Sequence, residues 1–210
     1  MSFFITFEGI DGCGKTTQLN MVANMLNDMG LKYIITREPG STDLGLKLRE
    51  ILLHHNGFVA PTCELFLYLA DRSQHIETVV KPALNEGKIV LCDRYIDSTV
   101  AYQGYGRGIS IEKLNSLNNI ATSSLEPNLT LLFDIDTMSA GERVGKTKDR
   151  LESAGLEFHN KVRMGYLDLS KKYSRIKVIN SEKTIDEVFE QTKSHVLELL
   201  AKWKKSFFFY

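Results

Sequence analysis

A glycine-rich stretch with a lysine and two threonines, SFFITFEGIDGCGKTTQLN, lies near the N-terminus. The spacing from Gly9 to Thr16 fits G-x-x-x-x-G-K-[ST], in which glycine amides surround a phosphate at a helix N-terminus. In this pattern Lys15 reaches the β- and γ-phosphates and the Thr16 hydroxyl holds Mg²⁺. A glycine-rich turn that binds nothing is the alternative, but the apolar run before the motif and the helical pattern after it favour the phosphate site. The stretch predicts a site for a nucleotide triphosphate.

Polar motifs also follow two later apolar runs. TREPGST begins at Thr36, and DRYIDSTVAYQGYGRG begins at Asp93, directly after the run ending at Cys92. A carboxylate in the position of Asp93 assists Mg²⁺ binding in enzymes with such a loop. Arg94 beside it is unexpected in a site that holds only a triphosphate.

A long predicted helix carries LYLADRSQH, in which Tyr68 and Arg72 are four residues apart and share one face. An aromatic ring and a guanidinium on one face suit a flat, hydrogen-bonding base. The alternative is that Tyr68 is a core residue and that Arg72 pairs with Glu64 or Asp71, and the spacing alone leaves both interpretations open.

A basic segment, GERVGKTKDRLE, follows the fourth predicted strand. Its charges would ordinarily form a solvated surface, and its glycines predict a mobile loop. In a phosphoryl transferase the same composition suits a lid, because charge on the transferred group must be offset without water. The basic residues are Arg143, Lys146, Lys148 and Arg150.

The elements that position these motifs alternate along the chain. Strands are predicted at 3–7, 32–36, 88–92, 129–135 and 177–179, and helices at 16–29, 43–54, 61–84, 111–124, 156–173 and 184–205. Such alternation predicts an α/β fold with a doubly wound parallel sheet of about five strands and helices on both faces. Ligands then bind beyond the carboxyl ends of the strands, where the motifs lie. We expect one domain over residues 1–210, with a lid at about 141–152.

Composition excludes several other classes of protein. The chain has 210 residues, 43% of them hydrophobic, and its 26 basic and 26 acidic residues balance. Neither a basic field for nucleic acid nor a run of membrane-spanning length is present. The three cysteines have no zinc-type spacing, which favours a reducing, cytoplasmic setting.

Taken together, the motifs GIDGCGKTTQ, TREPGST, LYLADRSQH, DRYIDSTVAYQG and DRLESAGLEFHNKVRMGY resemble those of bacterial thymidylate kinases. The resemblance runs from about residue 3 to residue 192. It implies Mg²⁺- and ATP-dependent phosphorylation of dTMP to dTDP by a homodimer with a P-loop NTPase-type fold. It also implies that the proline of the Glu38–Pro39 pair follows a cis peptide bond.

The resemblance assigns roles residue by residue. The residues expected to bind ATP are Gly9, Ile10, Asp11, Gly12, Cys13, Gly14, Lys15, Thr16 and Thr17, with Thr16 and Asp93 at the metal. Those expected to bind dTMP are Glu38, Pro39, Arg49, Tyr68, Arg72, Asp93, Arg94, Thr99, Tyr102 and Gln103. Among the latter, Tyr68 matches the position that stacks on thymine, and Tyr102 the one that crowds the ribose 2′ position. Arg72, Thr99 and Gln103 match those that address the base edge. The catalytic candidates are Lys15, Asp11, Arg94, Arg143 and Arg150.

One departure within the family concerns Gly12, where some thymidylate kinases carry a basic residue. The chain resembles the second subtype, in which the lid supplies the catalytic charge. We favour Arg143 and Arg150 over the two lysines, because a guanidinium can bridge two oxygens. An arginine introduced by Gly12→Arg is expected to restore part of the charge lost when the lid residue is removed.

Three other functions fit the sequence less well. A deoxynucleoside kinase would share the fold, but arginines at the acceptor site are unnecessary for an uncharged hydroxyl. A GTPase switch needs N-K-x-D after a strand, and the nearest match, at Asn160, lacks the acid and lies in a predicted helix. A nucleic-acid-binding protein needs a basic face, which a neutral chain does not predict.

Overall fold

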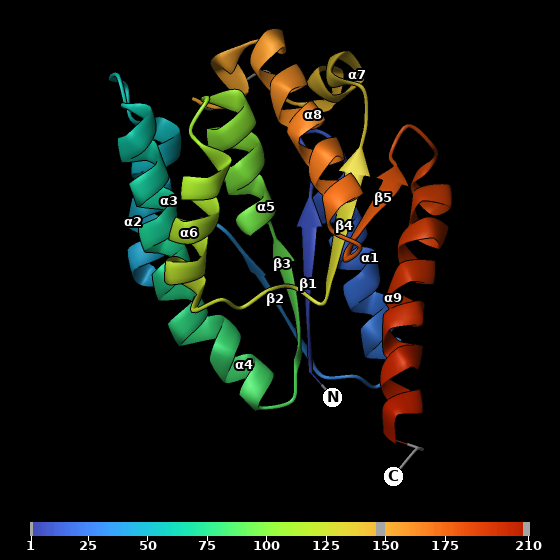
Figure 1. Cartoon of the computed structure of the whole chain (residues 1–210). Coiled ribbons are helices and arrows are strands. Elements are labelled where there is room, and N and C mark those ends of the chain that lie inside the picture. Colours follow the sequence, from blue (N-terminus) through green and yellow to red (C-terminus); the bar gives the residue numbers. More distant parts are fainter. Residues whose placement is uncertain (1, 146–149, 208–210) are drawn as a thin grey trace.

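Five parallel strands form one sheet between two layers of helices (Figure 1) in the computed structural model, which describes residues 2–145 and 150–207. The strands are β1 (Phe3–Glu8), β2 (Tyr33–Arg37), β3 (Ile89–Asp93), β4 (Leu129–Asp134) and β5 (Ile176–Asn180). Their order across the sheet is β2-β3-β1-β4-β5. The predicted doubly wound parallel sheet is confirmed, with each predicted strand present.

The helices are α1 (Lys15–Asp28), α2 (Asp43–His54), α3 (Pro61–His75), α4 (Lys81–Asn85), α5 (Ile96–Thr99), α6 (Ile111–Thr122), α7 (Thr137–Arg143), α8 (Leu156–Lys172) and α9 (Ile185–Phe207). Two π-helical segments, η1 (Ile76–Val80) and η2 (Val100–Gly106), continue α3 and α5, and a 3-10 turn, η3 (Glu152–Ala154), precedes α8. Across the described ranges, no helix is long and apolar enough to cross a membrane.

The centre of the sheet is β1, which pairs with β3 on one side and β4 on the other. Every residue of β1 is buried, because helices cover both faces. Successive side chains of β1 point to opposite faces of the sheet. Ile5 packs in the cluster that contains Leu19 of α1, whereas Phe4 packs with Val90 and Ile76. Each such side chain contributes about 1.5–3 kcal/mol when fully buried. The sheet is therefore a rigid support for whatever follows its strands.

The carboxyl ends of all five strands meet at one edge, because every pairing is parallel. The residues that end the strands there are Glu8, Arg37, Asp93, Asp134 and Asn180. Segments that lie 29 or more positions apart in sequence are thereby brought together at the edge where ligands bind in such folds.

The segment from Ile96 to Gly106 is helical in the structure, although no helix was predicted there. Its β-branched residues and glycines have low helix propensity, so the local pattern gave no helical signal. Tertiary packing prevails, because Val100, Ala101 and Tyr102 are buried in the main core cluster together with α8 residues such as Val162. The π-helical turn also changes the direction of the side chains in this segment, as π-bulges at functional sites commonly do.

The predicted mobile loop at 141–152 is wrong at its start, because Gly141 to Arg143 form the last turn of α7. Asp136 caps this helix: its Oδ1 accepts hydrogen bonds from the backbone N–H groups of Met138 (2.9 Å) and Ser139 (3.4 Å). The basic side chain of Arg143 thus stands at a helix C-terminus, where a cation is favoured. Lys146 and Lys148 lie outside the described residues.

Candidate active site

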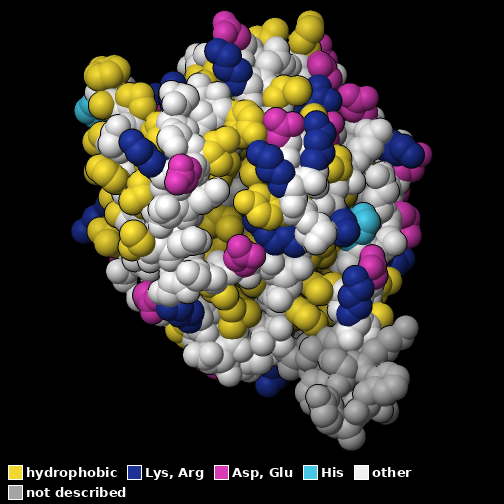
Figure 2. Space-filling view, in the orientation of Figure 1, with side chains coloured by type: hydrophobic (Ala, Val, Ile, Leu, Met, Phe, Trp, Pro, Cys, Tyr) yellow, Lys and Arg dark blue, Asp and Glu magenta, His cyan; other side chains and the backbone are white. Residues whose placement is uncertain are grey.

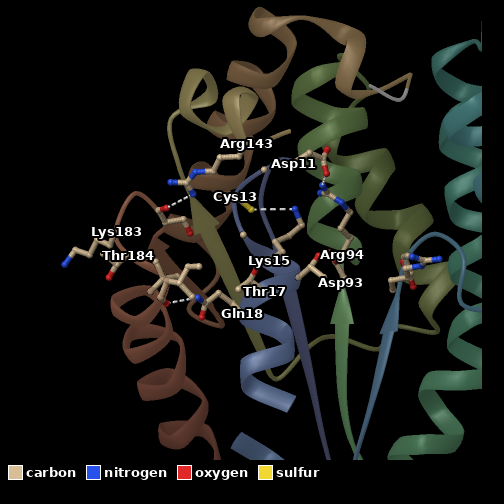
Figure 3. Close-up of a pocket in the computed structure, with 18 of the residues that line it drawn as sticks. Asp11, Cys13, Lys15, Thr17, Gln18, Asp93, Arg94, Arg143, Lys183 and Thr184 are labelled. Carbon is tan, nitrogen blue, oxygen red and sulfur yellow. Dashed lines mark hydrogen bonds and ion pairs between the residues drawn. The ribbon is translucent and has the colours of Figure 1, made fainter. Parts of the chain in front are cut away.

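The glycine-rich loop connects β1 to α1 and borders a cavity of ≈ 700 Å³ (Figure 3). Gly12 and Gly14 have φ angles of 81° and 90°, a region that residues with a Cβ rarely adopt. Lys15 begins the helix and donates hydrogen bonds through Nζ to the carbonyl oxygens of Gly9 (3.1 Å) and Ile10 (3.0 Å). A buried ammonium group therefore lies at the N-terminus of α1, whose first backbone N–H groups have no partner within the helix, and this combination is typical of an anion-binding site.

Most residues predicted to bind the triphosphate line this cavity. They are Asp11, Gly12, Cys13, Gly14, Lys15, Thr16 and Thr17. Gly9 and Ile10 belong to the loop but are not part of the cavity wall.

Gly12 lies directly against α7. A Cβ added to Gly12 would come within 2.3 Å of the carbonyl oxygen of Ala140, a distance that no real side chain tolerates. Together with the positive φ, this contact makes the expected rescue by Gly12→Arg wrong, since the introduced arginine would displace α7 and Arg143 with it. The C-terminal half of α7 is thus packed on the glycine-rich loop.

Asp93 and Thr16 bring two oxygen groups together in the same cavity. The Thr16 hydroxyl donates to Asp93 Oδ2 at 3.4 Å, and Asp93 Oδ1 is buried without a hydrogen bond from any residue that the structure describes. An orphaned carboxylate oxygen beside a hydroxyl fits Mg²⁺, which usually takes one or two protein ligands and completes its shell with phosphates and water. The described residues contain no group of three or more His, Cys, Asp or Glu that could hold a metal.

A second, smaller cavity of ≈ 80 Å³ adjoins the first. Nine residues predicted to bind dTMP line it: Glu38, Pro39, Arg49, Tyr68, Arg72, Arg94, Thr99, Tyr102 and Gln103. Asp93, predicted for both substrates, lines only the larger cavity. Asp93 therefore lies apart from the other nine residues that the resemblance assigns to dTMP.

Arg72 is fully buried on the wall of the small cavity and belongs to a fixed network. Its Nε donates to Glu38 Oε2 (2.7 Å), and Nη1 donates to Thr99 Oγ1 (2.6 Å) and Asn118 Oδ1 (2.7 Å). Nη2 donates to the carbonyl oxygen of Tyr95 at 3.0 Å. The alternative partners considered from sequence, Glu64 and Asp71, are wrong, because the turn containing Glu38 brings that carboxylate to the guanidinium. The Glu38–Pro39 peptide bond is cis, as predicted.

Asp11, Glu38, Arg49 and Arg94 line both cavities and form the junction between them. Arg94 Nη2 contacts Asp11 Oδ1 at 2.5 Å, and Nη1 donates to the carbonyl oxygen of Gly9 at 2.9 Å. Arg94 adopts a φ of 70°, which is uncommon for a residue with a side chain and marks a constrained position. Burial raises the pKa of Asp11, but the charges of Arg94 and Lys15 outweigh it and lower that pKa below its usual range. The junction therefore holds an ionised acid between two cations.

Glu8 supports the junction from the end of β1. Its buried carboxylate accepts hydrogen bonds from the backbone N–H of Tyr95 (2.7 Å), the Ser98 hydroxyl (2.5 Å) and the Tyr166 hydroxyl (2.9 Å). Burial, and then the neighbouring charge of Asp97, raise its pKa to about 7, although Ser98 and other polar neighbours act in the opposite direction.

This raised pKa predicts a pH-dependent stability. Between its ordinary pKa of 4.5 and the folded value of about 7, Glu8 binds a proton in the folded state but not in the unfolded chain. Its contribution to the free energy of unfolding is therefore fully present below pH 4.5 and is lost as the pH rises to about 7, by on the order of 3 kcal/mol. Glu8→Gln stays neutral and is expected to remove this loss. Urea unfolding of both proteins at pH 5 and pH 8 measures the difference, and equal pH dependence would contradict the assignment.

The two favoured lid arginines occupy different places. Arg143 lines the larger cavity and donates through Nη1 to the carbonyl oxygen of Ser181 at 3.1 Å, as Figure 3 shows. Arg150 does not line it; its Nη1 contacts Glu64 Oε2 at 2.6 Å and its Nε donates to the carbonyl oxygen of Leu52 at 2.9 Å. The buried carboxylate of Glu64 accounts for this position. The structure thus brings one of the two arginines to the glycine-rich loop.

Part of the larger cavity wall was missed in the sequence. Most of the missed residues lie after β5 and at the start of α9, namely Ser181, Lys183, Thr184, Ile185 and Val188, and the others are Gln18 and Arg37. No motif marks this segment, but the rule that ligands bind beyond strand ends applies to β5 as it does to the other strands. Leu53, Ser98 and Leu151, which line the small cavity, were missed as well. Their residue types gave no signal for a binding site.

Comparisons with known proteins agree with this arrangement. The family model described as thymidylate kinase matches residues 7–192. The chain is 47% identical to a thymidylate kinase of Syntrophotalea carbinolica, over 95% of this chain and 98% of that protein. It is 49% identical to one of a Sulfurihydrogenibium species, over 90% of this chain and 93% of that protein. The crystal structure of thymidylate kinase from Ehrlichia chaffeensis superimposes with a TM-score of 0.75 at 36% identity, over 92% of this chain and 98% of that one.

Proposed function

The chain belongs to the thymidylate kinase family and phosphorylates dTMP to dTDP with ATP as the donor, and from this premise we propose how its residues divide the work. The observation that carries the proposal is the pair of adjoining cavities with a shared charged border. Phosphoryl transfer requires that the triphosphate of the donor and the monophosphate of the acceptor lie in line. Two cavities that meet at arginines suit this requirement, because each can hold one of the two anions.

The larger cavity is the donor site. Its backbone N–H groups and Lys15 bind the β- and γ-phosphates of ATP, and the segment from Ser181 to Val188 accommodates the rest of the nucleotide. Thr16 and Asp93 would hold Mg²⁺, which when bound neutralises phosphate charge. Their adjacent oxygens support this assignment. Activity that persists at full rate in excess chelator would refute the metal requirement.

The smaller cavity is the acceptor site. Tyr68 stacks on thymine, while Arg72, Thr99 and Gln103 address the base edge and Tyr102 lies against the sugar. Arg49 and Arg94, at the junction, bind the monophosphate. A monophosphate acceptor is negatively charged and needs cations at this place, whereas an uncharged nucleoside does not. The two arginines therefore favour a nucleoside monophosphate kinase over a deoxynucleoside kinase.

Two arginines stabilise the negative charge that develops on the phosphoryl group during transfer. Arg94 is held at the junction by Asp11, and Arg143 reaches the donor cavity from α7. Asp11 acts through Arg94 rather than on phosphate, since an ionised carboxylate would repel the substrates. Preorganised cations in an enclosed site lower the barrier without reorganising during the reaction.

A coupled assay of ADP release across nucleosides and nucleoside monophosphates tests the proposal. We expect turnover with dTMP and none with thymidine. Thymidine phosphorylation at a comparable rate would indicate a nucleoside kinase, and nucleotide hydrolysis independent of any acceptor would indicate a switch protein.

Tyr68→Ala is expected to weaken dTMP binding by roughly 1–3 kcal/mol, because one base–aromatic stack contributes about that much. The KM for ATP should stay unchanged, since Tyr68 lines only the acceptor cavity. Isothermal titration with dTMP provides the measurement, and Phe58→Ala, an exposed aromatic side chain that lines neither cavity, is the matched control. An unaltered dTMP affinity would make Tyr68 a core residue.

We also propose a homodimer formed through α2 and α3. Leu44, Leu46 and Ile51 of α2 and Phe66 of α3 are about half exposed, and apolar side chains gather on that side of the molecule (left in Figure 2). Exposed apolar patches of this kind commonly mark protein interfaces. Sedimentation as a monomer at micromolar concentration would refute the dimer.

We further propose that residues 1–210 function as one kinase domain, with a lid at about 141–152, in the cytoplasm. The free thiols of Cys13, Cys63 and Cys92 support a reducing setting. Recovery of the native protein from an oxidising compartment would contradict the location, and independent folding of a fragment would contradict the single domain.

A further inference from the structure

Glu64 of α3 is a fully buried carboxylate that has no part in the steps above. It lines neither cavity, yet it accepts hydrogen bonds from three residues in two other segments. Gln103 Nε2 donates to Oε1 at 2.8 Å, and Arg107 Nη2 and Arg150 Nη1 lie 3.2 and 2.6 Å from Oε2. Burial raises the pKa of Glu64, but the hydrogen bonds from Gln103 and Arg150 and the charge of Arg107 outweigh it and hold that pKa below its usual range. Glu64 is therefore ionised and can only accept hydrogen bonds.

An acceptor-only partner fixes the orientation of the Gln103 side chain. The amide nitrogen must face Glu64, because the amide oxygen would otherwise oppose a carboxylate oxygen. Gln103 is buried and lines the acceptor cavity. One N–H of the Gln103 amide is bonded to Glu64, and Oε1 receives no hydrogen bond from any part of the chain that the structure describes, so Oε1 is available to the cavity as an acceptor.

Arg72 offers the same cavity the opposite group. A guanidinium has five N–H groups, and four of those on Arg72 are directed to Glu38, Thr99, Asn118 and the backbone of Tyr95. The remaining N–H, on Nη2, has no partner among the described residues. The two residues that line this cavity thus keep one N–H donor, on Arg72, and one amide oxygen acceptor, on Gln103, for a ligand.

These two groups match one pyrimidine edge and oppose the other. Thymine presents the O4 acceptor next to the N3–H donor, whereas cytosine presents the amino donor on N4 next to the N3 acceptor. With Gln103 held as an acceptor and Arg72 as a donor, cytosine would place donor against donor and acceptor against acceptor. A buried mismatch of this type is more costly than a missing methyl group.

We propose that Glu64 is a positioning residue that makes the acceptor cavity reject cytosine nucleotides, by holding the Gln103 amide in one orientation. This proposal rests on the assignment of that cavity to dTMP. Glu64 acts on base choice through Gln103 and touches no substrate.

The test is the ratio of kcat/KM for dCMP to that for dTMP in Glu64→Gln. A glutamine at position 64 can donate or accept, so the amide of Gln103 is free to turn over. We expect the ratio to rise by at least about tenfold, because the turned amide would match the cytosine edge that the wild-type site opposes. Part of this rise should be an increase in kcat/KM for dCMP, and not only a decrease for dTMP. Loss of structure alone would lower both activities together and leave the ratio unchanged.

Two variants serve as controls. Arg107→Gln removes one arm of the cluster but keeps the hydrogen bond from Gln103 to Glu64, and its ratio should stay at the wild-type value. Glu77→Gln removes an exposed carboxylate that pairs with Lys81 on the surface, and it should alter neither activity. A raised ratio in Arg107→Gln would overturn the specific role of Gln103.

Gln103→Leu keeps the proposal falsifiable if Glu64→Gln does not fold. It removes the acceptor itself, so the dCMP to dTMP ratio should rise as it does in Glu64→Gln, and the double variant should show no further rise. An unchanged ratio in both single variants, with Tyr68→Ala still weakening dTMP binding, would overturn the role of Glu64 and leave the proposed function intact. An unchanged dTMP affinity in Tyr68→Ala as well would overturn the assignment of the cavity.

Discussion

Arg143→Ala is expected to lower kcat by about 10³–10⁵-fold, which corresponds to roughly 4–7 kcal/mol of barrier, the usual contribution of an arginine finger. Arg143 lines the donor cavity, and Gly12 leaves the glycine-rich loop without a basic side chain at that position. Since the interaction is made mainly in the transition state, the affinity for dTMP should change little. Steady-state kinetics with both substrates varied provide the measurement.

Arg150→Ala is the matched comparison, because Arg150 belongs to the same predicted lid but is bound to Glu64. Its kcat should fall far less than that of Arg143→Ala. Lys146→Ala and Lys148→Ala complete the series. If Arg143→Ala stays within a few-fold of wild type, the catalytic charge comes from one of these lysines or from Arg94, and the assignment of Arg143 fails.

Lys15→Ala is expected to lower kcat by at least about 10²–10³-fold, the cost of removing one preorganised group that stabilises developing charge. The free energy of unfolding should change by only ~1 kcal/mol, because Lys15 Nζ contacts backbone carbonyls and not the apolar core. Kinetics under saturating ATP and urea unfolding measure the two effects separately. Lys193→Ala, an exposed lysine of α9, controls for a general effect of lost charge. Near-normal turnover in Lys15→Ala would contradict the role of the loop.

Local patterns were sufficient to predict the fold and the donor loop. The run from Phe3 to Phe7 is buried on both faces because it is the central strand, and Gly9, Gly12 and Gly14 after it have positive φ angles, which glycine adopts readily. The rule that ligands bind beyond strand ends also predicted that the motifs beginning at Thr36 and Asp93 lie near that loop, since parallel pairing brings the ends of β1, β2 and β3 to one edge.

The sequence could not predict partners that depend on tertiary packing. Arg72 pairs with Glu38, 34 positions away, and not with the carboxylates near it on the helix. Arg150 was predicted to serve the phosphates, but a buried carboxylate on α3 binds it in the structure. The helix from Ile96 to Gly106 forms against its own propensities, because its apolar side chains are buried against α8.

The contact between Gly12 and Ala140 has an evolutionary consequence. A basic residue at position 12 would clash with α7 in its present place. A substitution at position 12 is therefore epistatic with any change that moves α7. Under the catalytic role proposed for Arg143, a descendant of this chain that moved this charge from α7 into the loop would first have to shift α7, and that shift would withdraw Arg143 before any replacement was available. The intermediate would be nearly inactive, and the location of the catalytic charge is for this reason resistant to change by single substitutions.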